Sequence, residues 1–197
     1  YNYGKSQSLI GNYGADKFKI ISKIPNFDNN SNTVYFIRKS LDEIFNDLKI
    51  KKIDTILFHD SDQLLSKKRE ELFKALSTYK DNKLIKRIGA SIYNDIDSEK
   101  LLNHFDLDVI QAPFNLFDNE NLTNGFLSKI KSRNIEFHAR SVFLQGILLL
   151  KIQDIPKKLC SLFPNLVILD EFCNDNKITR LEACLNYVNS IKEIDYM

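Results

Sequence analysis

The sequence predicts an α/β protein built on a parallel β-sheet. Short apolar runs rich in Ile, Phe and Leu alternate along the chain with segments whose apolar residues recur at helical spacing. Repeated alternation of strand and helix favours parallel strands joined by right-handed crossovers. This order alone is compatible with a closed barrel and with an open doubly wound sheet.

The first half of the chain contains two predicted strand-helix units. Strand 18–24 is followed by a polar loop at 25–32 and by helix 33–49, whose apolar residues form one stripe: Val34, Ile37, Leu41, Ile44 and Leu48. Strand 53–58 precedes helix 67–80, in which three apolar residues are expected to face inward: Leu72, Phe73 and Leu76.

The second half continues the alternation. Strand 86–91 precedes a short helix at 97–104, and strand 107–112 precedes a helix at 120–132. Strand 135–141 leads through a longer segment to helix 178–190, which carries four spaced apolar residues: Ile178, Leu181, Leu185 and Val188.

Composition indicates one domain over residues 1–197, because 197 residues with 43% hydrophobic and 27% charged residues suffice for a sizeable core. The sequence has no apolar stretch of about twenty residues and no signal-peptide pattern, which favours a cytoplasmic protein without a membrane partner. The formal charge of +2 is spread along the chain, and basic patches such as 49–52 are short. These patches are interpreted as solvated helix faces, so no nucleic-acid partner is expected.

No metal site is predicted. Cys160, Cys173 and Cys184 are odd in number and not closely paired, as expected for reduced thiols and not for a disulfide frame or a zinc site. Asp60 and Asp62 follow a predicted strand, but no further ligands are evident beside them. They are interpreted as solvated loop residues, with shaping of a substrate mouth as the alternative.

Three residues predict a proton-transfer site. Lys23 and His59 each end a strand-like apolar run, and Tyr3 lies in a Tyr-Gly-Lys-Ser segment near the start of the chain. Polar side chains at the carboxyl ends of parallel strands point into the crevice where α/β proteins carry out chemistry. His104 and His138 lack such a context and are expected to be structural.

Several motifs occur in a fixed order, one at each predicted strand end. Besides the segments around Tyr3, Lys23 and His59, they include Arg-Ile-Gly-Ala-Ser at 87–91, Val-Ile-Gln-Ala-Pro-Phe-Asn at 109–115 and Arg-Ser-Val-Phe-Leu-Gln-Gly at 140–146. This order resembles the aldo-keto reductases, and the last two motifs are especially similar to a bacterial branch of that family. The resemblance covers nearly the whole chain.

The resemblance implies a (β/α)₈ TIM-type barrel that reduces a carbonyl with hydride from NADP(H) or NAD(H). Tyr3 would donate a proton to the carbonyl oxygen, and a free phenol, with a pKa near ~10, needs help to exchange protons at neutral pH. Lys23 would supply that help, because a nearby ammonium favours the phenolate. His59 would hydrogen-bond the carbonyl of the small-molecule substrate and fix its approach.

The resemblance also implies cofactor contacts. Ser91 and Gln111 match residues that hold the nicotinamide carboxamide, although Ile92 stands where the family often has an Asn. Arg140 occupies the place of a stacking aromatic ring, and a planar guanidinium can also stack. The segment expected along the pyrophosphate contains three further residues: Ser141, Phe143 and Gly146.

The match is incomplete at both ends of the chain. The family's active-site Asp lies five residues ahead of the Tyr, and this sequence begins at Tyr1. Residues 191–197 resemble the entrance to strand eight. We therefore expect strands three to seven of the barrel, with strands one, two and eight largely absent, and an artificial boundary in preference to a naturally shortened chain.

Two function classes remain open. The chain is expected to belong to an NAD(P)H-dependent reductase of an aldehyde, ketone or sugar carbonyl. The alternative is a non-catalytic relative that serves as a binding or regulatory subunit, or an inactive truncated fragment. A hydrolase or isomerase is disfavoured because the sequence has neither a Gly-x-Ser-x-Gly elbow nor a phosphate-cradling glycine loop. Neither the substrate nor the oligomeric state follows from the sequence.

Overall fold

The computed structural model describes residues 4–28, 31–93 and 95–197, apart from the side chains of 95–99 and 123. Within these residues, five strands lie side by side in the order β1 (Ile21–Ile24), β2 (Ile53–Phe58), β3 (Ile85–Ser91), β4 (Val109–Pro113) and β5 (Glu136–Arg140). The pairs β1–β2, β2–β3 and β3–β4 are parallel. The predicted parallel α/β sheet is confirmed.

The chain divides into two compact units, residues 1–111 and residues 112–197, and the boundary falls inside β4 (Val109–Pro113). Each unit is described by itself below. The prediction of a single domain stays a prediction.

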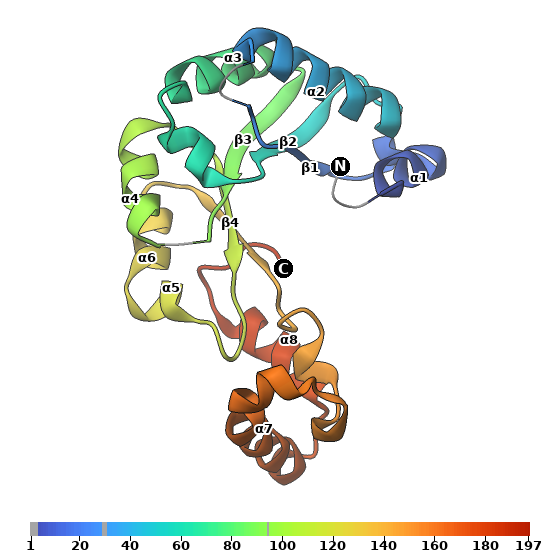
Figure 1. Cartoon of the computed structure of the whole chain (residues 1–197), viewed down its shortest axis with the longest axis vertical. Coiled ribbons are helices and arrows are strands. Elements are labelled where there is room, and N and C mark those ends of the chain that lie inside the picture. Colours follow the sequence, from blue (N-terminus) through green and yellow to red (C-terminus); the bar gives the residue numbers. More distant parts are fainter. Residues whose placement is uncertain (1–3, 29–30, 94) are drawn as a thin grey trace. The chain divides into compact units, whose positions relative to one another are not determined.

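The first unit consists of strands that alternate with helices. α2 and α3 lie along one face of the strands, as Figure 1 shows. Its elements, besides the first part of β4 and two 3₁₀ turns at Ala15–Lys17 and Ser61–Leu65, are α1 (Ser6–Tyr13), β1 (Ile21–Ile24), α2 (Thr33–Leu48), β2 (Ile53–Phe58), α3 (Arg69–Asp81), β3 (Ile85–Ser91) and α4 (Asp95–His104).

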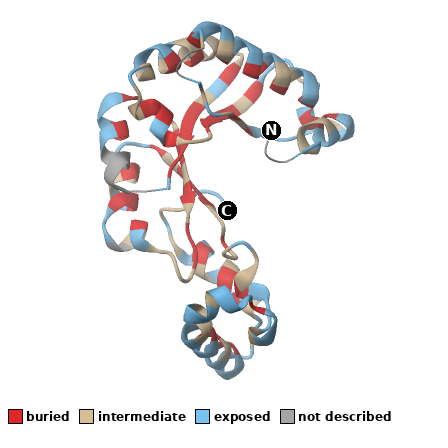
Figure 2. Ribbon diagram, in the orientation of Figure 1, coloured by how far each residue is buried: buried red, intermediate tan, exposed pale blue. Residues whose placement is uncertain are grey.

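The core of the first unit lies between these strands and the inner stripes of α2 and α3 (Figure 2). Four of the five residues predicted for the α2 stripe are buried: Ile37, Leu41, Ile44 and Leu48. Val34 was predicted wrongly, because it is 67% exposed. Val34 is the second residue of α2. The first turn of this helix is capped by the Asn32 side chain, which accepts a hydrogen bond from the Tyr35 N–H.

The second unit combines β5 with a group of helices. Its elements, besides the rest of β4 and 3₁₀ turns between residues 147 and 162, are α5 (Glu120–Thr123), α6 (Phe126–Ser132), β5 (Glu136–Arg140), α7 (Phe163–Asn176) and α8 (Arg180–Ser190). The helix predicted over 120–132 is divided in two, because Gly125 adopts a left-handed backbone (φ 78°). Phe114 and Phe137 are fully buried in this unit, and the Phe114 ring stacks on Tyr187.

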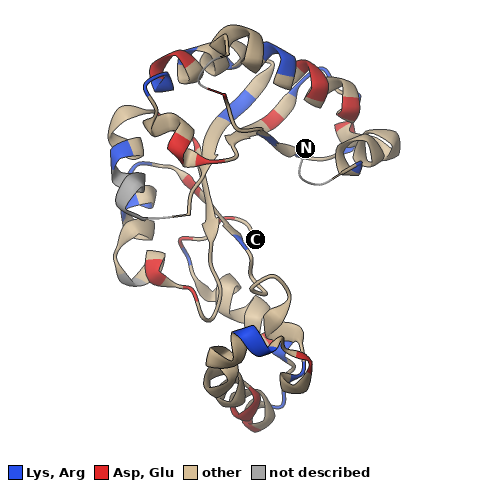
Figure 3. Cartoon of the chain, in the orientation of Figure 1, with Lys and Arg blue, Asp and Glu red and all other residues tan. Residues whose placement is uncertain are grey.

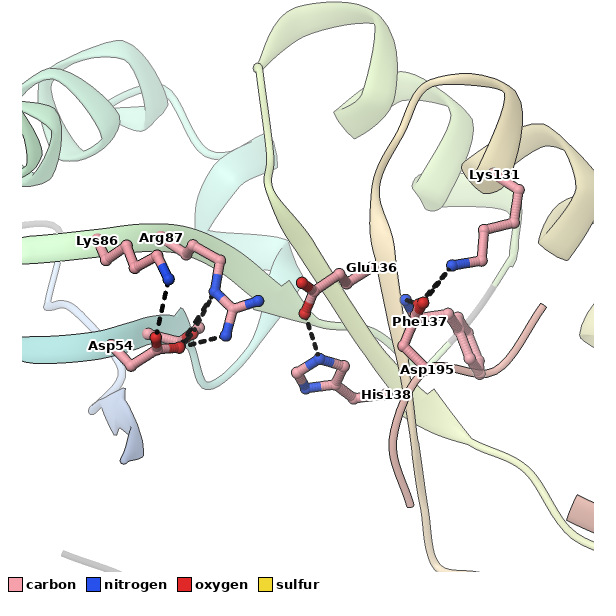
Figure 4. Close-up of polar contacts among 9 residues, drawn as sticks. Asp54, Lys86, Arg87, Lys131, Glu136, Phe137, His138 and Asp195 are labelled. Atoms are coloured by element: carbon pink, nitrogen blue, oxygen red, sulfur yellow. Dashed lines mark hydrogen bonds and ion pairs between the residues drawn. The ribbon is translucent and has the colours of Figure 1, made fainter. Parts of the chain in front are cut away.

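The C-terminal segment of the second unit pairs alongside β5. Asp195 N–H donates to the Phe137 carbonyl (3.0 Å), and Ala139 N–H donates to the Tyr196 carbonyl (2.8 Å). A parallel bridge joins His138 to Tyr196. The Asp195 carboxylate also accepts hydrogen bonds from Phe137 N–H (2.7 Å) and Lys131 Nζ (2.6 Å), as Figure 4 shows. The segment predicted to enter a further strand therefore begins to pair in the parallel sense.

Charged residues of both signs are distributed along the helices, as Figure 3 shows for α2 and α3. Across the part of the chain that the structure describes, no helix combines the length and apolarity needed to cross a bilayer.

An ion-pair cluster lies at the amino-terminal end of β2 and β3 (Figure 4). Arg87 Nη2 and Nε donate to Asp54 Oδ2, and Arg87 Nε also donates to Thr55 Oγ1 (3.1 Å). The side chains of Asp54 and Arg87 are only 11% and 14% exposed. Burial by itself raises the pKa of Asp54, but the hydrogen bonds from Arg87 and Thr55 and the nearby positive charges outweigh it and lower that pKa.

This shift predicts a pH-dependent contribution to stability. Because the pKa of Asp54 is lower in the folded chain, its contribution is fully present above the unfolded value of about 4 and is lost as pH falls through the folded value. At neutral pH, Asp54→Asn should lower the free energy of unfolding by about 1–3 kcal/mol. Urea denaturation of both proteins between neutral and acidic pH should show this difference shrinking below pH ~4. A difference that stays constant into acid would contradict the assignment.

Candidate active site at the carboxyl ends of the strands

The strand register of the first unit places Lys23 in a row of four residues. Lys23 is level with Leu57 of β2, Leu57 with Gly89 of β3, and Gly89 with Val109 of β4. Two residues further along β3, Ser91 is level with Gln111 of β4. Since alternate residues of a strand share a face, Lys23, Ser91 and Gln111 lie on the same face near the carboxyl ends of their strands. The register thus gathers three of the predicted site residues.

Lys23 and Ser91 are in direct contact across β2. Lys23 Nζ donates to Ser91 Oγ at 3.4 Å, which is long for a hydrogen bond, and the Ser91 side chain is fully buried. Next to this pair, Ile92 N–H donates to the Gln111 carbonyl (2.9 Å) and continues the pairing of β3 with β4. The side chain of Gln111 is half-buried. A hydroxyl, an amide and a cation are therefore grouped at this end of the sheet.

Gly89 makes the close approach of these strands possible. A Cβ at this position would lie 2.1 Å from the Val109 carbonyl oxygen and 2.7 Å from Leu57 Cδ2. The Leu57 side chain therefore occupies the space beside Gly89. The motif at 87–91 includes this glycine because only a residue without a Cβ fits here.

Lys23 also lines an open cavity of about 400 Å³ between the start of α1, the end of β1 and α2. Gly4 and Gln7 contribute to the same cavity, and Gln7 Nε2 donates to Ser22 Oγ (2.5 Å), which ties α1 to β1 beside Lys23. The predicted proton donor Tyr3 lies outside the described residues. Its neighbour Gly4 thus shares a cavity with Lys23, although Gly4 is far from Lys23 in the sequence.

His59 is the first residue after β2 and is half-buried. Its backbone N–H donates to the carbonyl of Ile24, the last residue of β1 (3.3 Å). This bond extends the pairing of β1 with β2 by one residue and holds His59 at the carboxyl ends of these two strands.

The other two histidines lie elsewhere. His104 is exposed at the end of α4. His138 is buried within β5, where its Nε2 lies 3.1 Å from Glu136 Oε2 (Figure 4).

The other predicted cofactor contacts belong to the second unit. Arg140 ends β5, and the following 141–146 loop contains Ser141, Phe143 and Gly146. This loop is unusual because several of its residues adopt left-handed backbone angles, with φ of 57° at Ser141, 46° at Leu144, 56° at Gln145 and 90° at Gly146. Residues with a Cβ rarely adopt this conformation, and such residues concentrate at ligand-binding sites.

Asn115 holds the start of this loop; it ends the 109–115 motif but was not predicted as a site residue. Its Nδ2 donates to the Ser141 carbonyl (3.2 Å), and its Oδ1 accepts from Phe117 N–H (2.9 Å). The side chain is fully buried. Asn115 lies two residues after the end of β4, and an Asn near a strand end commonly forms this kind of local turn, so the Pro-Phe-Asn sequence contained the signal.

The donor set suits an organic cofactor better than a metal. Among the residues whose side chains the structure describes, no three His, Cys, Asp or Glu residues cluster as metal ligands. The buried Ser91 hydroxyl beside Gln111 can bind a carboxamide, which both donates and accepts hydrogen bonds. The backbone N–H groups of a loop with left-handed residues can bind phosphate oxygens. The first feature, in the first unit, suits a nicotinamide carboxamide, and the second, in the second unit, suits a pyrophosphate.

Comparisons with known proteins agree on one family. The family model described as "Aldo/keto reductase family" matches residues 1–192. The structure is similar to the aldo-keto reductase AKR11C1 from Bacillus halodurans in its holo form, with a TM-score of 0.80 and 15% identity over 100% of this chain and 68% of that one. It is also similar to the glycerol dehydrogenase AKR11B4 from Gluconobacter oxydans, with a TM-score of 0.77 and 18% identity over the same shares. A search of curated proteins found no match. These findings confirm the expected resemblance and the partial (β/α)₈ fold.

Gly89→Ala should disturb both stability and the Lys23–Ser91 contact. The new methyl group must displace backbone of β4 or the Leu57 side chain, so the free energy of unfolding should fall by about 1–3 kcal/mol. Gly125→Ala is the control, because its Cβ meets nothing within 4 Å and only the left-handed backbone is disfavoured. Chemical denaturation measures both. If Gly89→Ala is as stable as the wild type, the close approach is not a constraint.

Proposed function

We propose that this chain, which belongs to the aldo/keto reductase family, forms the catalytic part of a reductase that converts a small aldehyde, ketone or sugar carbonyl to an alcohol. Proteins of this family are in general NAD(P)H-dependent oxidoreductases. The observation that carries the proposal is the contact of Lys23 with Ser91 beside Gln111 at the carboxyl ends of the strands. In this group, Lys23 is suited to assisting proton transfer, and Ser91 and Gln111 are suited to binding a nicotinamide.

The proton chemistry is assigned to Tyr3, Lys23 and His59. Tyr3 donates its phenolic proton to the carbonyl oxygen, and the positive charge of Lys23 favours the phenolate that remains. The cavity that Lys23 shares with Gly4 supports this pairing. His59 donates a hydrogen bond to the same oxygen and orients the carbonyl for reaction.

The cofactor contacts are assigned within each unit from the family resemblance. In the first unit, Ser91 and Gln111 would hydrogen-bond the carboxamide of NADPH or NADH, which would supply the hydride. In the second unit, Arg140 would stack its guanidinium on the nicotinamide. The 141–146 loop, including Ser141, Phe143 and Gly146, would bind the pyrophosphate.

The substrate class is a small polar carbonyl compound. The glycerol dehydrogenase among the similar structures is named for a polyol, and its likeness to this chain supports a hydroxylated substrate here. Polar loops follow the strand ends of this chain; Asp60 directly follows His59, and Asp62 lies two residues further on. Their carboxylates can accept hydrogen bonds from substrate hydroxyl groups.

Substitution of the proton donor tests the proposal. Tyr3→Phe should lower kcat about 10²–10⁴-fold while NADPH and NADH bind as tightly as in the wild type, because only the hydroxyl is removed. Lys23→Met should also lower kcat, and Lys17→Met, which changes an exposed lysine, is the matched control. The assay follows oxidation of each reduced cofactor by absorbance with an aromatic aldehyde and a hydroxylated aldehyde.

The outcomes separate the two function classes. Unchanged turnover in Tyr3→Phe would overturn the assigned donor. If the wild type binds a nicotinamide cofactor but turns over no carbonyl compound, the protein is a binding or regulatory relative. If it binds neither NADPH nor NADH, the proposed function fails altogether.

A further inference from the structure

Arg180, the first residue of α8, joins three segments of the second unit. Its Nε and Nη2 donate to the two carboxylate oxygens of Asp170 on α7, at 2.6 and 2.7 Å. Its Nη1 donates to the Leu150 carbonyl at 2.6 Å and reaches the Leu148 carbonyl at 3.4 Å. The Arg180 side chain is only 12% exposed. One guanidinium therefore binds both α7 and the chain that follows β5.

The two carbonyl acceptors are coupled to the 141–146 loop. Leu148 N–H donates to the Phe143 carbonyl (3.2 Å), and Leu149 N–H donates to the Gly146 carbonyl (3.0 Å). Leu148 is fully buried. The carbonyls that Arg180 binds lie at the end of the 3₁₀ turn Ile147–Leu149, where backbone acceptors lack partners within the turn. A shift of this turn is thus transmitted to Phe143 and Gly146.

The 141–146 loop needs such external restraint. Ser141, Leu144 and Gln145 adopt left-handed angles despite carrying a Cβ, so the loop is not the conformation that its own residues prefer. Asn115 restrains its first residue through the Ser141 carbonyl. Arg180 binds carbonyls at the end of the 3₁₀ turn that follows the last residue of the loop. Together these side chains hold the loop at both ends.

A simple ion pair between α7 and α8 does not account for this geometry. A lysine at position 180 would provide the charge for Asp170, but it lacks the planar fork that serves a carboxylate and backbone carbonyls together. The hydrogen bonds from Arg180 lower the pKa of Asp170, as expected for a tightly held bidentate pair. Asp170 in turn fixes the plane of the guanidinium, so that Nη1 faces the carbonyls.

We infer that Arg180 is a positioning residue that, held by Asp170, fixes the 141–146 loop in the conformation that binds the cofactor pyrophosphate. This inference rests on the proposed cofactor role of the loop. Arg180 itself does not touch the cofactor in this account. It raises cofactor affinity by removing the need to order the loop on binding.

An open cavity of about 510 Å³ beside Arg180 provides a specific test. Residues 149–153 and 179–181 line it together with Asp170. In Arg180→Ala, methylguanidinium can enter from this cavity and restore the bonds to Asp170 and to the carbonyls. Methylammonium, which carries the same charge without the fork, is the matched control.

The experiment measures dissociation constants for NADPH and NADH by fluorescence titration, together with limited proteolysis of residues 147–154. Arg180→Ala should bind the cofactor about 10–100-fold more weakly, because charged hydrogen bonds that order its site are lost. It should also be cleaved faster in this segment without cofactor. Methylguanidinium should restore most of the affinity, and methylammonium should not. Arg38→Ala, which breaks the exposed ion pair with Asp42, should change neither measurement.

The possible failures are distinguishable. If the wild type binds cofactor and a folded Arg180→Ala protein binds it equally well, the inference is wrong and the proposed function stands. If methylammonium restores affinity as well as methylguanidinium, only charge matters and positioning by the fork is excluded. If Arg180→Ala does not fold, Arg180→Lys replaces it, and wild-type affinity in that variant overturns the inference. If the wild type binds neither nucleotide, the inference and the proposed function both fail.

Discussion

The parallel register of β1 to β4, which depends on the close approach at Gly89, determines the rest of the site. A parallel ladder places the carboxyl ends of all its strands at one edge, so residues from distant parts of the chain meet there without any direct sequence relation. Gly89 leaves no Cβ between the Val109 carbonyl and Leu57 Cδ2. In this register Lys23 Nζ contacts Ser91 Oγ across β2.

The second unit shows a different way of fixing a functional segment. Its 141–146 loop follows β5 directly and adopts angles that its side chains disfavour. The restraint comes from polar side chains that bind backbone carbonyls: Asn115 at the Ser141 carbonyl and Arg180 at those of Leu148 and Leu150. A loop ordered in advance binds its ligand with a smaller loss of conformational entropy. In the proposed function, the restraint on the loop would therefore raise cofactor affinity.

Sequence patterns predicted each of the five strands that the structure describes, whereas they missed the helices α1 and α7. β2 has the predicted bounds, and β3 differs from its prediction by one residue. Short runs rich in apolar residues, Ile above all, identify such buried strands. α7 was missed, since apolar residues lie all around it and Val167, Ile168 and Phe172 are exposed, which leaves no amphipathic stripe to recognise. Leu181 was expected on an apolar stripe but is 46% exposed, and Ala183 and Cys184 are buried in α8 instead. Periodicity alone could not show which side of this helix has a partner.

The candidate site was foreseeable only in part. Lys23 and His59 were singled out because a polar residue at the end of an apolar, strand-like run is a local signal. The contact of Lys23 with Ser91 depends on a register that no local pattern encodes. Asn115 had a weak signal as an Asn after a strand. Arg180 had none, since its partners are an acid ten residues earlier and two backbone carbonyls that any residue could supply.

A crystal structure of the protein with bound oxidised nicotinamide cofactor tests the central claim most directly. The account predicts that the carboxamide lies within hydrogen-bonding distance, about 2.7–3.2 Å, of both Ser91 Oγ and the Gln111 side chain, with Lys23 Nζ still beside the same edge of the sheet. A nicotinamide bound away from the carboxyl ends of β3 and β4 would contradict it.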